Sequence, residues 1–385
     1  MTERSPALST LNEEEQLLRD TVLDFARQKI QARSGQMDKD ASMPPDIIAG
    51  LFDLGVMGIE VPEEYGGAAA SFFSAVLVVE ALAQVDASVS VLLDVQNTLV
   101  LNSILRSGNE AQKKKYLPLL SSSWVGSYAL SEAGSGSDAF ALSTRATKDG
   151  NKYILDGSKL WITNAAESEL FIVFAKTNPE LGHKGITSFL VERGTPGFSI
   201  GPKEDKLGIR ASSTCPLTFE QVSIAEENVL GEIGRGYKIA METLNEGRIG
   251  IGAQMVGIAQ AALDLALAHT QGRIQFSQPL ASFQGVQFQL AQMRVDLETA
   301  RLLVYNAARL KDAGQPFLLA AAMAKLRASE VAESLASQAI DLLGGVGFIR
   351  EYAAEKLYRD AKIGKIYEGT SNMQLLTIAK QILVE

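Results

Sequence analysis

The chain has 385 residues and a formal net charge of −9, with 46% hydrophobic and 21% charged residues. This composition is typical of a folded globular protein with two or three compact units, because disordered chains carry far fewer hydrophobic residues. The acidic balance argues against a nucleic-acid partner, although a local basic pocket for one anionic ligand remains compatible with it.

The N-terminal stretch MTERSPALSTLNEEEQ lacks the apolar core of a signal peptide and is too acidic for a transit peptide. We therefore expect the cytoplasm of a bacterium, with a processed chain in the mitochondrial matrix as the alternative. No apolar run approaches the roughly 20 residues that span a bilayer, so we expect no membrane insertion. Cys215 is the single cysteine, and His183 and His269 are the two histidines, which leaves no intrachain disulfide and almost excludes a Cys/His metal site.

The first third of the chain shows helical periodicity. Asn12 and the acidic residues behind it form a typical helix start. Another helix begins behind the paired prolines of PPDIIAGLFD, and the helical pattern resumes from about 71 to 120 after the turn-rich stretch EVPEEYGG. These features predict an N-terminal helical domain over residues 1–123.

Short β-branched or aromatic runs replace this pattern from Trp124 onward. VGSYALS, LFIVFAKT, GITSFLVER and STCPLTFEQVSI are separated by turn sequences such as KDGN and LDGS. They predict a β domain over residues 124–232.

Helical periodicity returns behind GEIGRGY. It covers about residues 236–271, 283–313 and 317–343, and shorter pieces follow. Long amphipathic helices joined by short loops predict an antiparallel bundle over residues 233–385. The fold class is therefore mainly α with a central β domain.

The segment YALSEAGSGSDA, residues 128–139, matches the spacing G-x-G-x-x-A of a dinucleotide-binding loop. That fingerprint opens a helix within a βαβ unit, whereas strand and turn sequence follows here, so we reject the Rossmann interpretation. What remains is either an ordinary β-turn or a loop of small residues whose backbone could approach a flat ring or a phosphate closely.

Three further motifs have ordinary explanations when each is taken alone. Trp161 and Thr163 alternate near the end of a strand and so share a face, as a buried core tryptophan would. Arg248 lies one helical turn after Leu244, where an isolated arginine is usually a solvated charge. Glu368, in IYEGTSN, lies in a break between helices, where turn residues are common.

Together and in this order, the motifs resemble the acyl-CoA dehydrogenase family over essentially the whole chain. The resemblance rests on the S-E-x-G-x-G-S-D loop and on W-I-T, R-x-x-F, L-G-G-x-G-F, R-D-A-K-I and I-Y-E-G-T-S. Within the family the chain looks most like the short/branched-chain members, as judged by ASSTCPLTFE, LNEGRIGI and ARLLVYNAARL. The resemblance implies an N-terminal helical domain, a middle β-barrel-like domain and a C-terminal four-helix bundle.

The resemblance also implies a reaction. Members of the family oxidise an acyl-CoA to its trans-2-enoyl-CoA: a carboxylate removes the α-proton, the β-hydrogen leaves as hydride to N5 of FAD, and electron-transfer flavoprotein then takes the electrons. The matching base is Glu368, because relatives of the isovaleryl and long-chain type carry their glutamate at the position of Gly247. We expect a short branched substrate such as 2-methylbutyryl- or isobutyryl-CoA. The alternatives are a straight short chain such as butyryl-CoA, a flavin oxidase or monooxygenase, and a non-catalytic scaffold without flavin.

By position in the family's motifs, a larger set of residues is expected to bind cofactor or substrate. Those expected along the flavin are Tyr128, Leu130, Ser131, Gly136, Ser137, Trp161, Ile162, Thr163, Thr370, Ser371 and Asn372. Those expected to hold the adenosine pyrophosphate across a subunit boundary are Arg273, Phe276, Gln284, Asp341, Gly344 and Gly345. Those expected to contact the acyl-CoA substrate are Ser137, His183, Tyr237, Asn245, Arg248 and Gly369.

An FAD site shared between chains implies a homo-oligomer, in this family usually a tetramer. Asp341 departs from the family pattern, since many relatives carry glutamine there. An acid beside phosphate is unfavourable unless it turns away or meets an arginine or a backbone N–H. No metal is expected.

Overall fold

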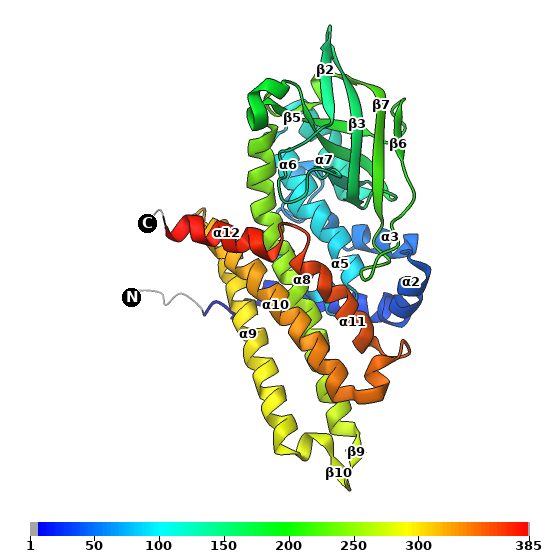
Figure 1. Cartoon of the computed structure of the whole chain (residues 1–385), viewed down its shortest axis with the longest axis vertical. Helices are drawn as coiled ribbons and strands as arrows, with labels where there is room; N and C mark the ends of the chain where they lie inside the picture. The colour runs from blue at the N-terminus through cyan, green and yellow to red at the C-terminus, as the bar shows by residue number, and fades with distance from the viewer. Residues whose placement is uncertain (1–6, 384–385) are drawn as a thin grey trace.

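The structure is a computed structural model that describes residues 7–383 (Figure 1). The predicted outer domain limits at residues 1 and 385 therefore lie outside the described residues. Helices fill both ends of the chain and a sheet lies between them in sequence, which confirms the predicted fold class.

The N-terminal helical part contains α1 (Glu13–Lys29), η1 (Gln31–Arg33), α2 (Ser34–Asp40), α3 (Pro45–Asp53), η2 (Val56–Gly58), η3 (Glu63–Tyr65), α4 (Phe72–Ala83), α5 (Ala87–Asp94), the π-helix η4 (Val95–Leu101), α6 (Asn102–Ser107) and α7 (Glu110–Ser122). Helix α1 begins where the sequence predicts it. The side chain of Asn12 accepts from the backbone N–H of Glu15, and the Glu15 side chain accepts from the backbone N–H of Asn12.

The middle part contains β1 (Val125–Ala129), β2 (Arg145–Asp149), β3 (Lys152–Thr163), β4 (Ser168–Lys176), η5 (Pro179–Gly185), β5 (Ile186–Glu192), β6 (Phe198–Ile200), β7 (Thr214–Ala225), η6 (Glu226–Asn228) and β8 (Val229–Leu230). The strands form one eight-stranded sheet in the order β6-β7-β3-β2-β4-β5-β8, and β1 pairs with β4 in parallel. No helix opens behind residues 128–139, in agreement with the rejected dinucleotide interpretation.

The C-terminal part contains α8 (Gly236–Gly272), β9 (Ile274–Gln275), β10 (Gln278–Pro279), η7 (Leu280–Ser282), α9 (Gln284–Asp312), α10 (Leu318–Leu343), η8 (Gly344–Phe348), α11 (Ala353–Ala361), η9 (Lys362–Lys365) and α12 (Ser371–Ile382). The three long helices end within one residue of their predicted bounds. The switches from helix to strand and back fall between α7 and β1 and between β8 and α8, while the exact domain limits at 123/124 and 232/233 stay predictions.

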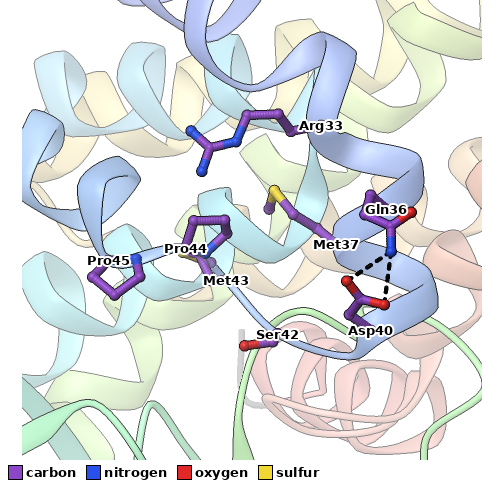
Figure 2. Close-up of a pocket in the computed structure, with 8 residues that line it drawn as sticks. All are labelled: Arg33, Gln36, Met37, Asp40, Ser42, Met43, Pro44 and Pro45. Atoms are coloured by element: carbon purple, nitrogen blue, oxygen red, sulfur yellow. Dashed lines mark hydrogen bonds between the residues drawn. The ribbon is translucent and has the colours of Figure 1, made fainter.

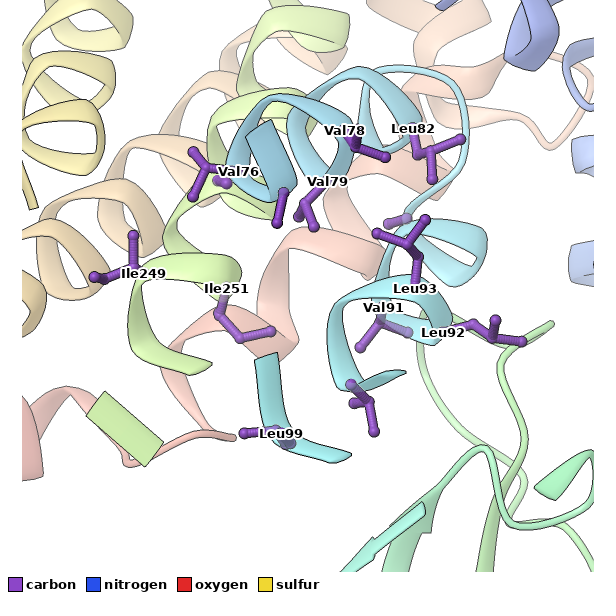
Figure 3. Close-up of a cluster of buried hydrophobic side chains, with 14 of the residues drawn as sticks. Val76, Val78, Val79, Leu82, Val91, Leu92, Leu93, Leu99, Ile249 and Ile251 are labelled. Carbon is purple, nitrogen blue, oxygen red and sulfur yellow. The ribbon is translucent and has the colours of Figure 1, made fainter. Parts of the chain in front are cut away.

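Helix α8 is the centre of the apolar core, as Figure 3 illustrates: Ile249 and Ile251 lie close to valine and leucine side chains of α4, α5 and η4. Glycines let the backbones approach. A Cβ on Gly257 would lie 2.4 Å from the carbonyl oxygen of Glu80 in α4, and one on Gly250 would lie 1.9 Å from Oδ1 of Asp94 in α5. α8 is therefore held against both N-terminal helices at fixed points.

By length and composition alone, two helical segments could cross a membrane: Ala87–Ser107 and Gly236–Gly272. Both are mostly buried within the fold, to 94% and 67% over their most apolar windows. A helix that is apolar on most sides is expected when other helices and strands surround it, so core packing accounts for their composition.

A buried ion pair joins strand β3 of the sheet to the loop that follows β1. Nζ of Lys159 in β3 lies 2.7 Å from Oε1 of Glu132, and both side chains are almost fully buried. Glu132 also accepts from the backbone N–H groups of Ser143 and Thr144. Burial opposes ionisation of Glu132, but attraction to Lys159 and these hydrogen bonds prevail and lower its pKa to about 2.

We predict that Lys159→Met lowers the free energy of unfolding by about 3 to 5 kcal/mol, because it leaves Glu132 buried and without its counter-charge. Urea unfolding of the purified protein at pH 7 measures this. Lys148→Met is the control, since Lys148 pairs with Glu226 at the exposed surface and its loss should change stability little. Equal effects of the two variants would contradict the importance of the buried pair.

Candidate active site

Glu368 lies in the short segment between η9 and α12, in a backbone conformation that few side chains adopt. Its φ is +50° and that of Gly369 is +85°. The left-handed region costs a residue with a Cβ roughly 1 to 2 kcal/mol, so the surroundings have to hold Glu368 there. Nε2 of Gln374 donates to the carbonyl oxygens of Glu368 and Gly369 at 3.1 and 2.8 Å, and Nζ of Lys325 donates to that of Gly369 at 2.7 Å.

Glu368 is half-buried as a residue, and one oxygen of its carboxylate is shielded from solvent. Its Oε2 is buried and has no hydrogen-bond partner among residues 7–383. Burial raises the pKa of Glu368 to about 7, against the opposing attraction of Lys325 and Arg248. A carboxylate with this pKa is a far better proton acceptor near neutral pH than an exposed glutamate.

Gly247 of α8 faces this carboxylate. A Cβ at that position would lie 2.9 Å from Oε2 of Glu368 and 2.9 Å from Cδ2 of Leu99. The glycine therefore leaves the room that the carboxylate uses, between α8 and the π-helix η4. One turn further along α8, Gly250 lies against Asp94, whose pKa burial and the nearby charge of Glu368 raise well above its usual range.

The residues expected along the flavin come from three segments of the chain, and Tyr128 of the first segment lies near Glu368. Tyr128 ends up in the core beside Phe174, and the proximity of Glu368 adds to the burial that raises its pKa. The backbone carbonyl of Ser131 accepts from the N–H of Leu160, which ties the loop after β1 to β3. Leu130 is buried, Ser131 is half-buried, and Gly136 and Ser137 lie exposed on the loop.

Trp161 differs from the ordinary expectation of a core tryptophan. It is 54% exposed and has a φ of +59°, at a place where the pairing of β3 with β7 shifts register. The bulge turns the indole outward, while its neighbour Ile162 is 2% exposed and packs in the core of the sheet. Because the Ile162 side chain packs in the core, only its backbone could contact a ligand. Thr163 is half-buried.

Segment 370–372 begins α12 directly behind the base. The Thr370 side chain accepts from the backbone N–H of Met373 and caps the helix. Oγ of Ser371 is buried without a hydrogen-bond partner in the described part of the chain, and Asn372 is exposed.

Three of the residues expected to contact substrate follow α8 away from Glu368: Arg248, Asn245 and Tyr237. Arg248 is half-buried rather than a solvated charge, and its Nη1 donates to Oδ1 of Asn245 at 3.0 Å. Tyr237 lies eleven residues before Arg248, which is about three helical turns along the same face of α8. Its ring packs edge to face on that of His183, with ring centroids 4.9 Å apart. His183 is exposed, so this aromatic pair lies at the outer end of the row.

The residues expected to hold the adenosine pyrophosphate lie elsewhere. All six are exposed, and Phe276 is 89% exposed in the turn between β9 and β10. In Figure 1 this turn lies at the end of the bundle opposite the sheet. At 1.5 Å per residue, Arg273 is roughly 37 Å from Arg248 along α8, so one chain does not bring the two groups together. Asp341 is exposed and forms no salt bridge with another of the residues 7–383.

Three buried polar residues near the base were missed by the sequence analysis: Lys325, Asp94 and Gln374, which are at most 1% exposed. A signal existed for the first two, because a lysine in AAAMAKL and an aspartate in SVLLDVQN each interrupt an apolar helical stretch. Nothing in the sequence around Gln374 marks its contact with the turn at Glu368.

The surface depression in Figure 2 is a separate feature of about 240 Å³ between α2 and α3. Its charged residues are already satisfied: Arg33 pairs with Asp46 at 2.6 Å, and Gln36 donates to Asp40 at 2.8 Å. It offers no reactive group. Across residues 7–383, no group of three or more His, Cys, Asp or Glu side chains is arranged to hold a metal ion.

Models of the three acyl-CoA dehydrogenase domains match the chain: N-terminal over 12–123, middle over 127–222 and C-terminal over 234–383. A short/branched chain specific acyl-CoA dehydrogenase of Rattus norvegicus, named as mitochondrial, is 53% identical over 98% of this chain and 88% of its own. A probable enzyme of the same kind from Dictyostelium discoideum is 52% identical over 98% and 91%.

Solved structures agree. Butyryl-CoA dehydrogenase from Megasphaera elsdenii superimposes with a TM-score of 0.95 at 42% identity, over 97% of this chain and 99% of its own. A chain from a structure described as the electron transferring flavoprotein of Acidaminococcus fermentans gives 0.96 at 40% identity, over 98% and 100%. A glutaryl-CoA dehydrogenase from Mycobacterium smegmatis in complex with FADH2 gives 0.92 at 32% identity, over 97% and 96%. The chain therefore belongs to the acyl-CoA dehydrogenase family, and it is an FAD-dependent oxidoreductase that acts on the CH–CH group of an acyl-CoA.

Proposed function

We propose that this enzyme dehydrogenates a short, α-branched acyl-CoA, such as 2-methylbutyryl- or isobutyryl-CoA, and that Glu368 removes the α-proton. The observation that carries the assignment of the base is the buried Oε2 without a partner, on a carboxyl whose pKa burial raises to about 7. A carbon acid beside a thioester is weakly acidic, so its base has to be kept dry and matched to neutral pH.

The residues around Glu368 fit a flavin. Tyr128, Arg248 and Ser371 each leave a buried polar atom without a partner among the described residues. The Trp161 ring is exposed and so is free to pack on a ligand. We assign the loop 130–137, residues 161–163 and residues 370–372 to the flavin part of FAD. FAD, when bound, supplies the acceptor for the β-hydrogen, which leaves as hydride.

The chain itself holds the proton and the developing charge. The Glu368 carboxylate takes the α-proton and becomes the neutral acid that burial favours. The backbone N–H of Glu368 has no hydrogen-bond acceptor in the described part of the chain, so it is available to the thioester oxygen as negative charge develops there. Lys325 and Arg248 keep a fraction of Glu368 ionised before substrate binds.

The α-branched substrate class is supported by the 52–53% identity to short/branched-chain enzymes. The missing side chain at 247 leaves the space that the Glu368 carboxylate occupies, and so it serves the base rather than the choice of substrate. A straight short chain is the rival, because the butyryl-CoA dehydrogenase of Megasphaera elsdenii is 42% identical.

Three further assignments belong to this proposal. Electron-transfer flavoprotein is the proposed electron acceptor, supported by the similarity to the Acidaminococcus fermentans chain. A homotetramer is proposed, because the exposed group around Phe276 is roughly 37 Å from Arg248 and would complete the FAD site of a second chain. The compartment stays a prediction: the cytoplasm of a bacterium or the mitochondrial matrix, and the rat relative is named as mitochondrial.

We predict that Glu368→Gln lowers kcat by at least roughly 10²- to 10⁴-fold, since an amide cannot accept the α-proton. Flavin absorbance recorded anaerobically after addition of 2-methylbutyryl-CoA measures this, and the flavin content of the variant should stay at the wild-type level. Rapid loss of flavin absorbance in the variant would place the base on another residue.

For the substrate, we predict a higher kcat/KM for 2-methylbutyryl-CoA than for butyryl-CoA. Steady-state assays of the purified protein with an artificial electron acceptor compare the two directly. A large preference for butyryl-CoA would reject the branched assignment while leaving the dehydrogenase reaction intact. Peroxide formation without an added acceptor would favour an oxidase instead.

Gly247→Ala should lower kcat/KM by roughly 10- to 100-fold, because its Cβ would displace the Glu368 carboxylate by a fraction of an ångström to an ångström. Gly35→Ala is the matched control, since Gly35 also lies in a helix but has open space where a Cβ would go. Unchanged kinetics of Gly247→Ala would mean that the carboxylate does not occupy this space during the reaction.

A further inference from the structure

Lys325 is the unexplained charged group next to the site. It lies on α10 with 0% exposure, and buried lysines are rare unless they are paired. Yet Lys325 forms no salt bridge within residues 7–383. Its ammonium group donates instead to the carbonyl oxygen of Gly369 at 2.7 Å, the residue directly after Glu368.

We infer that Lys325 is a positioning residue for proton abstraction: its ammonium group fixes the left-handed turn at Glu368 and Gly369 and supplies the positive charge that keeps the Glu368 carboxylate ionised. The inference rests on the proposed role of Glu368 as the base. It assigns to α10 a part in the chemistry that neither the motifs nor the comparisons indicate.

The geometry of the turn supports the positioning role. The Gly369 carbonyl accepts from Lys325 and from Gln374, so donors on two helices hold it from both sides. One turn further along α10, Oγ of Ser329 donates to the carbonyl oxygen of Gly364 at 2.8 Å. Helix α10 therefore fastens the segment 364–369 at two points, and Lys325 is the point beside the base.

The charges that face Glu368 come from several elements. Lys325 on α10 and Arg248 on α8 are the cations, Asp94 at the end of α5 is the second acid, and Tyr128 of β1 and the adjacent Tyr367 are phenols. Burial raises the pKa of both phenols above their usual range, so they are neutral near pH 7, and it raises the pKa of Asp94 well above its usual range, which favours the neutral acid. Of the two cations, Lys325 lowers the pKa of Glu368 more than Arg248 does.

Loss of the Lys325 charge should change the pKa of Glu368 in one direction. Without it the ionised carboxylate is less favourable, so the pKa of Glu368 moves upward from about 7. The unprotonated base then appears only at higher pH. The coupling is reciprocal: burial lowers the pKa of Lys325 to about 8, and the negative charge of Glu368 limits that decrease.

The test is the pH dependence of kcat/KM for three variants in the holoenzyme. Lys325→Met removes both the charge and the donor, and Lys325→Gln removes the charge but keeps a donor for the Gly369 carbonyl. Both should move the midpoint of the rising limb upward by about one pH unit or more and lower kcat/KM at pH 7 at least tenfold. Ser329→Ala is the control, because it loses a fastening hydrogen bond on the same helix without changing charge, and its midpoint should match the wild type.

A midpoint in both Lys325 variants equal to that of the wild type would overturn the inference, while inactivity of Glu368→Gln would leave the proposed function standing. Activity in Glu368→Gln would instead remove the base and the inference together. Should neither Lys325 variant fold, the titration of Lys325 by ¹⁵N NMR of selectively labelled protein decides. A midpoint near 8 that falls further in Glu368→Gln supports the inference, and an unperturbed midpoint in both proteins rejects it.

Discussion

The free-energy cost of burying one carboxylate is the constraint on which the site depends. Glu368 is placed where Oε2 meets neither water nor a donor within the described residues, and this desolvation makes it basic enough for chemistry at neutral pH. The same cost would drive the side chain outward if the backbone allowed it. The left-handed turn, held by Gln374 and Lys325, removes that freedom.

The architecture supplies the dry environment. α8 crosses the molecule with glycines against α4 and α5, so the N-terminal and C-terminal helices close around Gly247 and Leu99 on one side of the carboxylate. The sheet contributes Tyr128 of β1, which is buried near Glu368. Both helical parts are needed to enclose Glu368, because the short segment between η9 and α12 that carries it cannot shield it alone.

Much of the fold could be predicted from sequence because local signals govern it. Asn12 caps α1 as predicted, and the long amphipathic helices of the bundle have the predicted bounds within one residue. The motifs also named Tyr128 of β1 and Arg248 of α8, which the fold brings near Glu368. Their roles toward FAD and substrate stay predictions.

The rest depended on tertiary structure. Alternation in β3 could not indicate that a bulge with positive φ turns Trp161 outward, since pairing with β7 sets that register. Lys325 meets Gly369 across 44 residues of sequence, and only the packing of α10 against the terminal segment joins them. The exposed position of Phe276 follows from the length of α8, which places it at the opposite end of the bundle.

The most direct test of this account is the ionisation of Glu368 itself, observed without turnover. Infrared difference spectra between wild type and Glu368→Gln, recorded as a function of pH, report the protonated carboxyl of this one residue. The account predicts a titration midpoint near 7. A midpoint at the ordinary value for glutamate, near 4.5, would show a solvated carboxylate and would contradict it.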